Sequence, residues 1–189
     1  MCALSLVGAL LAATPAQALE LAGAQFPDQI TVATKPLQLN GAGVRYKAMF
    51  RVYAAGLYAP SKSTVVAEVS DTATPKRLHI VMLREIDSTE LGNMFARGME
   101  ENAERGAMTR LLPGIMRMSQ VFSDHKRLVA GDSFQMDWVP GTGAVLTIKG
   151  KVIGEPFREP EFYRALLGIW LGPKPADWKL KDAMLGREN

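Results

Sequence analysis

The sequence contains very little cysteine and histidine. Cys2 is its one cysteine, and the two histidines, His79 and His125, stand in unrelated contexts. Zinc and copper are held chiefly by clustered cysteine and histidine side chains, so no usual site for either metal can be assembled. We therefore predict no bound metal.

The motifs of several enzyme classes are missing as well. The sequence has no G-x-S-x-G nucleophile elbow and no P-loop. Gly41-Ala42-Gly43 begins like a dinucleotide-binding fingerprint, but Tyr46 stands where the third glycine is needed. These absences disfavour a hydrolase, a metalloenzyme and a nucleotide-dependent enzyme, and we predict no cofactor.

Long stretches without charge are also rare, and the longest lies at the N-terminus. Residues 1–18 carry no charge and end in Ala16-Gln17-Ala18, a pattern typical of a secretory signal peptide. No later segment reaches about 18 uninterrupted apolar residues, the length that indicates a transmembrane helix. We predict a signal peptide over residues 1–18 and one domain over residues 19–189, which is secreted or lies in a bacterial periplasm. Because Cys2 belongs to the leader, the mature chain has no disulfide and depends on its hydrophobic core.

The excess of positive charge is small. Lys and Arg number 22 and Asp and Glu number 19, which gives a net charge of +3, and the basic residues are scattered. This signal is too weak to indicate nucleic-acid binding, but it mildly favours anionic ligands and contact with lipid headgroups at a membrane surface. With 189 residues, 48% of them hydrophobic, the composition is that of one globular domain.

The apolar pattern predicts an α+β fold. Strands are expected over residues 29–33, 44–58 (one strand, or two folded back on each other), 76–86, 134–139, 144–148 and 151–154. Asn40-Gly41 is predicted to be a turn. Helices are expected after the capping box Asp87–Glu90, over residues 107–122 with an interruption at Pro113-Gly114, and from Pro160. Since the last three strands form an antiparallel meander, we predict an antiparallel sheet with the helices on one face.

Two polar side chains, Arg45 and Tyr53, lie in the otherwise apolar and glycine-rich stretch 39–59. A buried arginine cannot lose its charge and requires an anion or strong acceptors. Arg45 and Tyr53 have the same parity, but eight residues of straight strand span about 26 Å, so they meet only if the chain reverses near Lys47–Met49. If they meet, they predict a site for a carboxylate or phenolate. Otherwise Arg45 pairs with a surface acid or bridges strand ends, and Tyr53 is a core tyrosine with a backbone partner.

Several segments carry a resemblance to a known family. They are residues 39–45 (LNGAGVR), 52–58 (VYAAGLY) and 169–173 (IWLGP), together with Asn102 and Leu185-Gly186. In this order and spacing the chain resembles the bacterial branch of the chalcone isomerase-like family over nearly the whole mature sequence. The resemblance implies an open-faced β-sandwich, in which a large antiparallel sheet has a layer of helices on one face and a ligand cleft lies between.

The resemblance also implies ligand-binding roles for Arg45, Tyr53, Phe95 and Asn102. Arg45 matches the family arginine by its G-x-R context, and Asn102 matches the asparagine of the true isomerases. Tyr53 falls where isomerases carry a threonine and fatty-acid-binding members carry a tyrosine. Phe95 falls where isomerases carry a tyrosine of the catalytic site, so its hydroxyl is missing here. On the residue pattern alone, Asn102 is equally explained as an amide that packs between helices.

These differences favour binding over catalysis. We expect a non-catalytic protein in which Arg45 and Tyr53 hold the carboxylate of a small apolar acid such as a fatty acid. The apolar chain is expected to lie on a surface that is also explained as ordinary core, made by Leu91, Phe95, Met99, Leu112 and Met116. The alternative is an isomerase of the intramolecular lyase type, with Arg45 stabilising an enolate and Asn102 or Tyr53 orienting the substrate oxygen. A third hypothesis, a scaffold without a small ligand, follows if a protein acid already neutralises Arg45.

Overall fold

The computed structural model describes residues 18–104, 106–125 and 127–187. Except for Ala18, the predicted signal peptide therefore lies outside the described residues, and so does Cys2. Within these ranges, no helix combines the length and the apolar character that crossing a bilayer requires.

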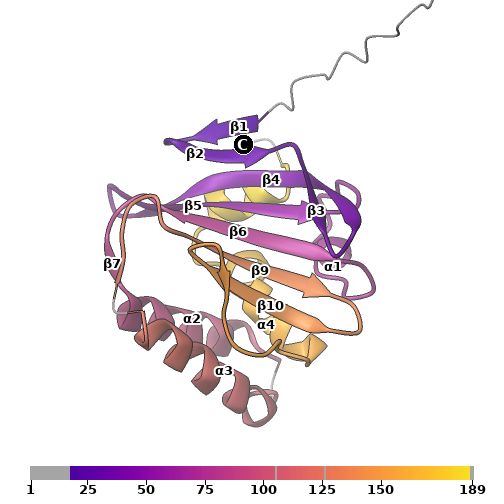
Figure 1. The fold of residues 1–189 in the computed structure, drawn as a ribbon, viewed down its shortest axis with the longest axis vertical. Coiled ribbons are helices and arrows are strands. Elements are labelled where there is room, and N and C mark those ends of the chain that lie inside the picture. The colour runs from indigo at the N-terminus through magenta and orange to yellow at the C-terminus, as the bar shows by residue number, and fades with distance from the viewer. Residues whose placement is uncertain (1–17, 105, 126, 188–189) are drawn as a thin grey trace, which may run out of the picture.

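A seven-stranded antiparallel sheet forms the centre of the fold, with the strand order β11–β10–β9–β6–β5–β4–β3 (Figure 1). The strands are β3 (Gln29–Val32), β4 (Lys35–Lys47), β5 (Phe50–Ala59), β6 (Lys76–Met82), β9 (Ser133–Val139), β10 (Gly143–Ile148) and β11 (Lys151–Val152). Residues 44–58 are thus two strands folded back on each other. The α+β class and the antiparallel meander are confirmed.

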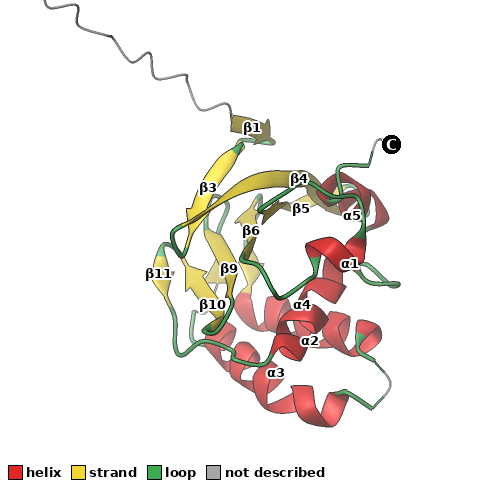
Figure 2. Cartoon of the chain, turned by 90° about the vertical axis from the view of Figure 1, so that its right-hand side faces the viewer, coloured by secondary structure: helices red, strands yellow, loops and turns green. Residues whose placement is uncertain are grey.

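The helices gather on one face of this sheet (Figure 2). They are α1 (Val66–Val69), α2 (Ser88–Asn102), α3 (Met108–Ser123), α4 (Pro160–Leu171) and α5 (Trp178–Met184). The Asp87 carboxylate caps α2 by accepting from the backbone N–H groups of Thr89 at 2.9 Å and Glu90 at 3.0 Å, as the capping pattern predicts. α4 begins at Pro160, also as predicted.

The predicted interruption of α3 at Pro113-Gly114 is wrong. The helix continues through Pro113, which is exposed on its outer side. Proline removes one hydrogen bond from a helix interior. The buried stripe of α3 holds the helix together in spite of this, since it packs Leu111, Ile115, Met118 and Phe122 into the core. Packing of one face outweighs a local helix breaker.

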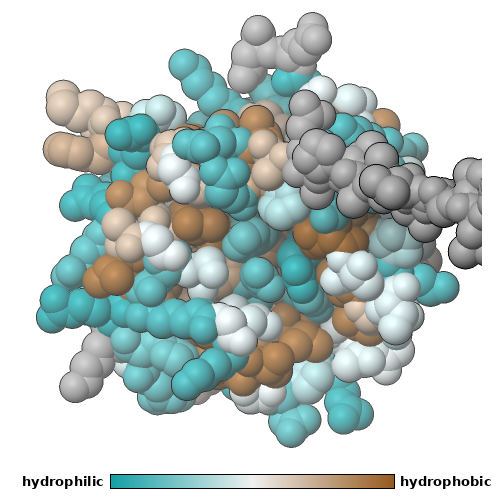
Figure 3. All heavy atoms as spheres, turned by 45° about the horizontal axis from the view of Figure 1, so that its top comes forward, coloured by the Kyte–Doolittle hydropathy of each residue, from teal (hydrophilic) through white to brown (hydrophobic). Residues whose placement is uncertain are grey.

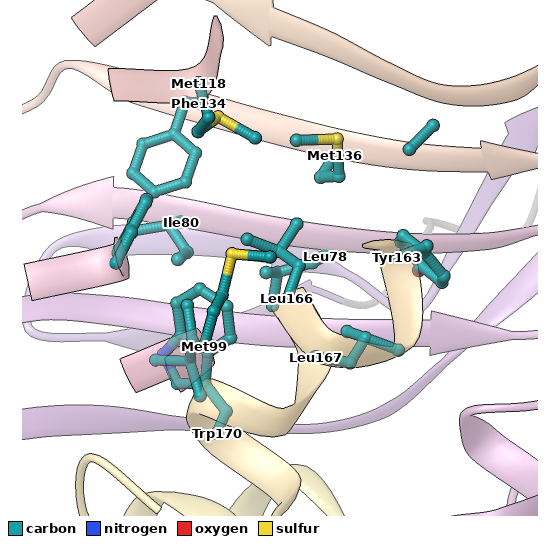
Figure 4. Close-up of a cluster of buried hydrophobic side chains, with 14 of the residues drawn as sticks. Leu78, Ile80, Met99, Met118, Phe134, Met136, Tyr163, Leu166, Leu167 and Trp170 are labelled. Carbon is teal, nitrogen blue, oxygen red and sulfur yellow. The ribbon is translucent and has the colours of Figure 1, made fainter. Parts of the chain in front are cut away.

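The main core lies between the sheet and the helices. Figure 4 shows its centre, where side chains of β6 and β9 meet those of α2, α3 and α4: Leu78, Ile80, Phe134, Met136, Met99, Met118, Leu166, Leu167 and Trp170. Trp170 is fully buried at this centre. Its indole therefore needs a hydrogen-bond partner inside the protein.

The opposite face of the sheet carries a smaller core that the sequence did not predict. A hairpin of β1 (Ala18–Leu21) and β2 (Ala24–Pro27) packs Phe26 against this face, where its ring lies edge-on to His79 at a centroid distance of 5.5 Å. Elsewhere, the short strands β7 (Ile86–Asp87) and β8 (Arg127–Leu128) pair with each other and tie the start of α2 to the chain after α3.

Candidate functional site

The glycines of β4 allow α5 to lie directly against this strand. A Cβ atom on Gly41 would overlap the carbonyl oxygen of Ala183, and one on Gly43 would lie 2.8 Å from the Ala183 Cβ. Arg45 follows on the same side of the strand, because side chains alternate along it. The spacing Gly41, Gly43, Arg45 therefore brings the N-terminal end of α5 next to the arginine.

Asn40-Gly41 is not a turn, contrary to the prediction. Both residues belong to β4, at a register shift between Leu39 and Gly41. The Asn40 amide donates to the Met184 carbonyl at the end of α5 (2.7 Å) and accepts from the Ser63 backbone N–H (2.7 Å). The asparagine thus fastens α5 to the sheet, a role that its local sequence does not distinguish from a turn.

The β4–β5 hairpin brings Arg45 and Tyr53 together. β4 and β5 are joined by the two residues Ala48 and Met49, and Ala48 adopts a positive φ of 53° without being glycine. Arg45 and Tyr53 are direct partners across the strands. Their Cβ atoms therefore lie about 5 Å apart on the side that faces the helices. The chain reversal that the pair required is present.

The Arg45 guanidinium contacts several groups of the protein. Its Nη1 donates to the Tyr46 carbonyl and forms an ion pair with the Asp177 Oδ2 at 3.7 Å, and the side chain is 22% exposed. Asp177 already accepts from the backbone N–H groups of Lys179, Leu180 and Tyr46, so it acts mainly as the cap of α5. The guanidinium also donates a hydrogen bond to the Tyr53 phenol, and Arg45 lines a cleft beside this pair, where a ligand can reach it.

The Tyr53 phenol keeps its proton. Its oxygen accepts a hydrogen bond from the Trp170 Nε1 at 2.9 Å. Burial raises the pKa of Tyr53 to about 12, although the Trp170 hydrogen bond and the charge of Arg45 act against this shift. At neutral pH the group is therefore a hydroxyl that can donate its own proton, and it is not suited to act as a base.

Arg45 and Tyr53 line a cleft between the β4–β5 hairpin and α2. The cleft has a larger compartment of about 760 Å³ and a smaller one of about 380 Å³. Both compartments are lined by Arg45, Lys47, Tyr53, Glu90 and Met94, so they adjoin. Lys47 and Glu90 form an ion pair at 3.7 Å between the hairpin and α2.

The two compartments differ in character. The larger one has charged groups along its walls, among them Arg97, Glu101 and Lys174. The smaller one has a larger apolar share, which includes Ala48, Phe50, Val52 and Ile86, although Arg84 and Glu85 line it too. Each compartment alone lies in the range of about 300–1,000 Å³ that is usual for sites of small organic molecules.

Phe95 lies at the cleft, whereas Asn102 does not. Phe95 lines the larger compartment and packs edge-on against Phe122, Phe134 and Trp170. The Asn102 amide donates to the carbonyls of Gly98 and Lys174, both at 2.9 Å, and accepts from the Lys174 N–H at 2.8 Å. Asn102 therefore joins the end of α2 to the loop after α4, as in the packing hypothesis, and the structure separates it from Arg45 and Tyr53.

The apolar surface predicted to receive a ligand chain is not assembled as expected. Of its five residues, only Phe95 lines the cleft. Leu91 and Met99 are buried in the core, and Leu112 and Met116 are exposed on the outer side of α3. Periodicity predicts a helix here, but it does not tell which apolar residues at the border of the buried stripe face outward.

Sequence reasoning missed two parts of the site. Asp177 lies 132 positions after Arg45, and the residues around it indicate only that it caps a helix. The hairpin residues Phe50 and Val52 were assigned to a buried strand, with no indication that they face a cleft. The described residues contain no group of three or more His, Cys, Asp or Glu side chains that could hold a metal ion.

Comparison with known proteins establishes the fold and the family. The structure is similar to the crystal structure of a fatty-acid binding protein from Arabidopsis thaliana, with a TM-score of 0.71, 16% sequence identity, and coverage of 89% of this chain and 96% of that chain. No curated protein sequence matches significantly. The model of the family described as chalcone isomerase-like matches residues 18–186. The chain therefore belongs to the chalcone isomerase-like family, and the resemblance of its sequence to this family is confirmed.

Proposed function

We propose that the protein binds a small apolar carboxylic acid in the cleft, most simply a fatty acid, without catalysing a reaction. The observation that carries the proposal is the cross-strand pairing of Arg45 with Tyr53 at a cleft of this size. The fold shared with a fatty-acid binding protein supports the same class of ligand.

The carboxylate would be held by donors of two kinds. Arg45 offers a planar guanidinium, which matches the two oxygens of a carboxylate. Tyr53 adds a neutral hydroxyl donor whose raised pKa keeps it protonated. Each hydrogen bond to a charged group contributes about 1.5–3 kcal/mol, which is enough to select acids over neutral analogues.

The apolar chain of the ligand would occupy the smaller compartment. Phe50, Val52, Ile86 and Met94 form the apolar part of its walls, Arg84 and Glu85 line it as well, and Arg45 and Tyr53 line both compartments. Each buried methylene contributes about 0.8 kcal/mol, so affinity is expected to rise with chain length until the compartment is full.

Neither alternative has comparable support. An isomerase would use Asn102 or a hydroxyl at position 95, but the Asn102 amide is occupied by Gly98 and Lys174 and Phe95 has no hydroxyl. A scaffold would require Asp177 to neutralise Arg45 with no cavity beside them. Asp177 does form an ion pair with Arg45, at 3.7 Å, but a cleft adjoins the pair, so the second condition is not met.

The test is a binding measurement with the purified protein. Mass spectrometry of extracted lipid identifies any acid that co-purifies, and calorimetry on the delipidated protein then measures the affinity for a fatty acid and for the alcohol of equal chain length. We expect the acid to bind at least about tenfold more tightly than the alcohol, because a charge-assisted hydrogen bond is lost with the alcohol. Arg45→Gln should abolish this preference.

Arg51→Gln is the matched control. It removes the same charge from the same hairpin, but Arg51 is exposed and lines neither compartment. It should bind the acid as the wild type does. Equal affinities for acid and alcohol, or equal losses in Arg45→Gln and Arg51→Gln, would refute the proposed site.

We also propose that residues 1–18 direct the protein out of the cytoplasm, into a bacterial periplasm or the medium. The uncharged run that ends in Ala16-Gln17-Ala18 supports this. Cell fractionation combined with N-terminal sequencing of the mature protein tests it, and a cytoplasmic protein with an intact N-terminus would contradict it.

A further inference from the structure

The turn of the β4–β5 hairpin exposes large apolar side chains. Met49 is 82% exposed, more than any other large apolar residue in the described part of the chain, and its neighbours Phe50 and Tyr46 are 58% and 45% exposed. We call Tyr46, Met49 and Phe50 the hairpin tip. In Figure 3 pale-brown apolar atoms project on the left, the side on which the β4–β5 turn lies in Figure 1. An apolar projection with a polar surround is typical of a contact surface.

Basic side chains surround the hairpin tip. Residues 45–51 include Arg45, Lys47 and Arg51 and no acid. From the neighbouring chain, the guanidinium of Arg84 lies 5.4 Å from the centre of the Phe50 ring. Long basic side chains beside exposed aromatic ones are suited to a boundary between water and an apolar phase.

The acids near the hairpin tip are already engaged. Glu90 pairs with Lys47 at 3.7 Å, Glu85 pairs with Arg127 at 3.0 Å, and Asp87 caps α2. No ion pair is recorded for Arg51 or Arg84 within the described ranges. The surface around the tip therefore has an excess of positive charge, and its natural complement is an anionic surface.

We propose that the hairpin tip docks onto lipid bilayers that contain anionic phospholipids. Met49, Phe50 and Tyr46 enter the headgroup region, and Arg51 and Arg84 lie against the lipid phosphates. Exposed apolar side chains beside the basic Arg51 and Arg84 are suited to a headgroup region, which favours an anionic bilayer over a folded protein as the occupant of the tip.

Docking in this way places the opening of the cleft at the membrane. Lys47, Ala48 and Phe50 belong to the hairpin turn and also line the smaller compartment. If the cleft binds a fatty acid as proposed above, the acid passes between bilayer and cleft without crossing bulk water. This transfer of the acid rests on the proposed function, but binding of the protein to vesicles can be measured without any fatty acid.

The first experiment measures binding of the full mature chain to vesicles by co-sedimentation. Vesicles of phosphatidylcholine are compared with vesicles that contain phosphatidylglycerol as well, at low and high salt. We expect binding to the anionic vesicles at least about tenfold tighter than to the neutral ones, with the difference lost at high salt because ions screen the charges.

Two variants and two matched controls locate the contact. Met49→Ser and Arg51→Gln should each weaken binding to anionic vesicles several-fold and, combined, about tenfold or more. Met116→Ser changes a methionine that is 64% exposed on α3, and Lys35→Gln removes a charge at the other end of β4. Both controls should bind vesicles as the wild type does.

The outcomes separate this proposal from the proposed function. Met49 and Arg51 line neither compartment, so their variants should keep the affinity for soluble fatty acid while losing vesicle binding. Intact acid binding with no vesicle binding, equal binding to neutral vesicles, or equal losses in the control variants would each overturn the docking. A dimer that Met49→Ser dissociates would do so too, because the occupant of the tip would then be a second copy of the chain.

Discussion

The contact between β4 and α5 predicts different effects for one chemical change, glycine to alanine, at three positions. At Gly41 the new Cβ would overlap the Ala183 carbonyl oxygen and lie 2.9 Å from that of Met184, both backbone atoms. At Gly43 it would meet the Ala183 Cβ at 2.8 Å and the Leu180 Cδ1 at 3.1 Å. At Gly92, inside α2, its nearest neighbour would be at 3.6 Å, an ordinary contact.

The magnitudes follow from what can move. Backbone atoms of α5 cannot yield at Gly41 unless the whole helix shifts, so Gly41→Ala should cost about 3 kcal/mol or more, the upper end of overpacking effects. Gly43→Ala should cost about 1–2 kcal/mol: the Leu180 side chain can rotate away, and the overlap that remains, with the Ala183 Cβ at 2.8 Å, is smaller than the overlap at Gly41. Gly92→Ala should stabilise by about 0.5–1 kcal/mol, since alanine is the better helix former and its methyl group has room.

Urea unfolding followed by tryptophan fluorescence measures all three free energies of unfolding. The double variant Gly43→Ala/Ala183→Gly adds a direct test, because removing the Ala183 methyl group should recover part of the loss. Three results would contradict this reasoning: Gly41→Ala as stable as the wild type, Gly43→Ala less stable than Gly41→Ala, or Gly92→Ala destabilised as much as the other two variants.

Two further predictions concern His79 and Asn102. Burial lowers the pKa of His79 to about 4, whereas in the unfolded chain it titrates near its ordinary value of 6.5. The unfolded state therefore takes up this proton first as the pH falls, and the wild type should lose about 3 kcal/mol of stability between roughly pH 6.5 and pH 4. His79→Gln should lack this part of the loss, which urea unfolding across that range detects; identical pH profiles would refute it. Asn102→Ala should destabilise by about 1–3 kcal/mol, because it leaves the Lys174 backbone groups without partners, and calorimetry should find its fatty-acid affinity unchanged. A loss of fatty-acid affinity without a loss of stability would instead indicate that Asn102 contacts the ligand.

The fold could be predicted from the sequence because its main signals are local. Alternation of apolar residues indicated the strands of the meander, and Asp87 and Pro160 marked the starts of α2 and α4. The β1–β2 hairpin and its small core were missed. Phe26 finds its partners on strands far along the chain, and no local pattern indicates that contact.

The site could be predicted only in part. The unusual charge at Arg45 and the phenol at Tyr53 drew attention to the correct strand pair, but the reversal between them has neither glycine nor asparagine and relies on Ala48 in a positive φ. Asp177 could not be predicted, because its position depends on how α5 lies on Gly41 and Gly43. A contact between a helix and a strand that are far apart in the sequence cannot be predicted from the local sequence of either one.

Asp177 also provides a test that separates binding from a purely structural role of Arg45. A ligand carboxylate on Arg45 would lie about 6 Å from the Asp177 carboxylate, and two like charges at that distance repel by about 3 kcal/mol at an effective dielectric constant of 20, less after screening by salt. Asp177→Asn removes this repulsion, and asparagine caps a helix as well as aspartate does. The variant keeps the Oδ1 acceptor that caps α5 but loses the Oδ2 acceptor of the Tyr46 N–H, so we expect Asp177→Asn to cost about 1–3 kcal/mol of stability and to bind a fatty acid several-fold more tightly in calorimetry. If Arg45 instead has a purely structural role as the partner of Asp177, the same variant should gain no affinity for a fatty acid, and this outcome would contradict the proposed site.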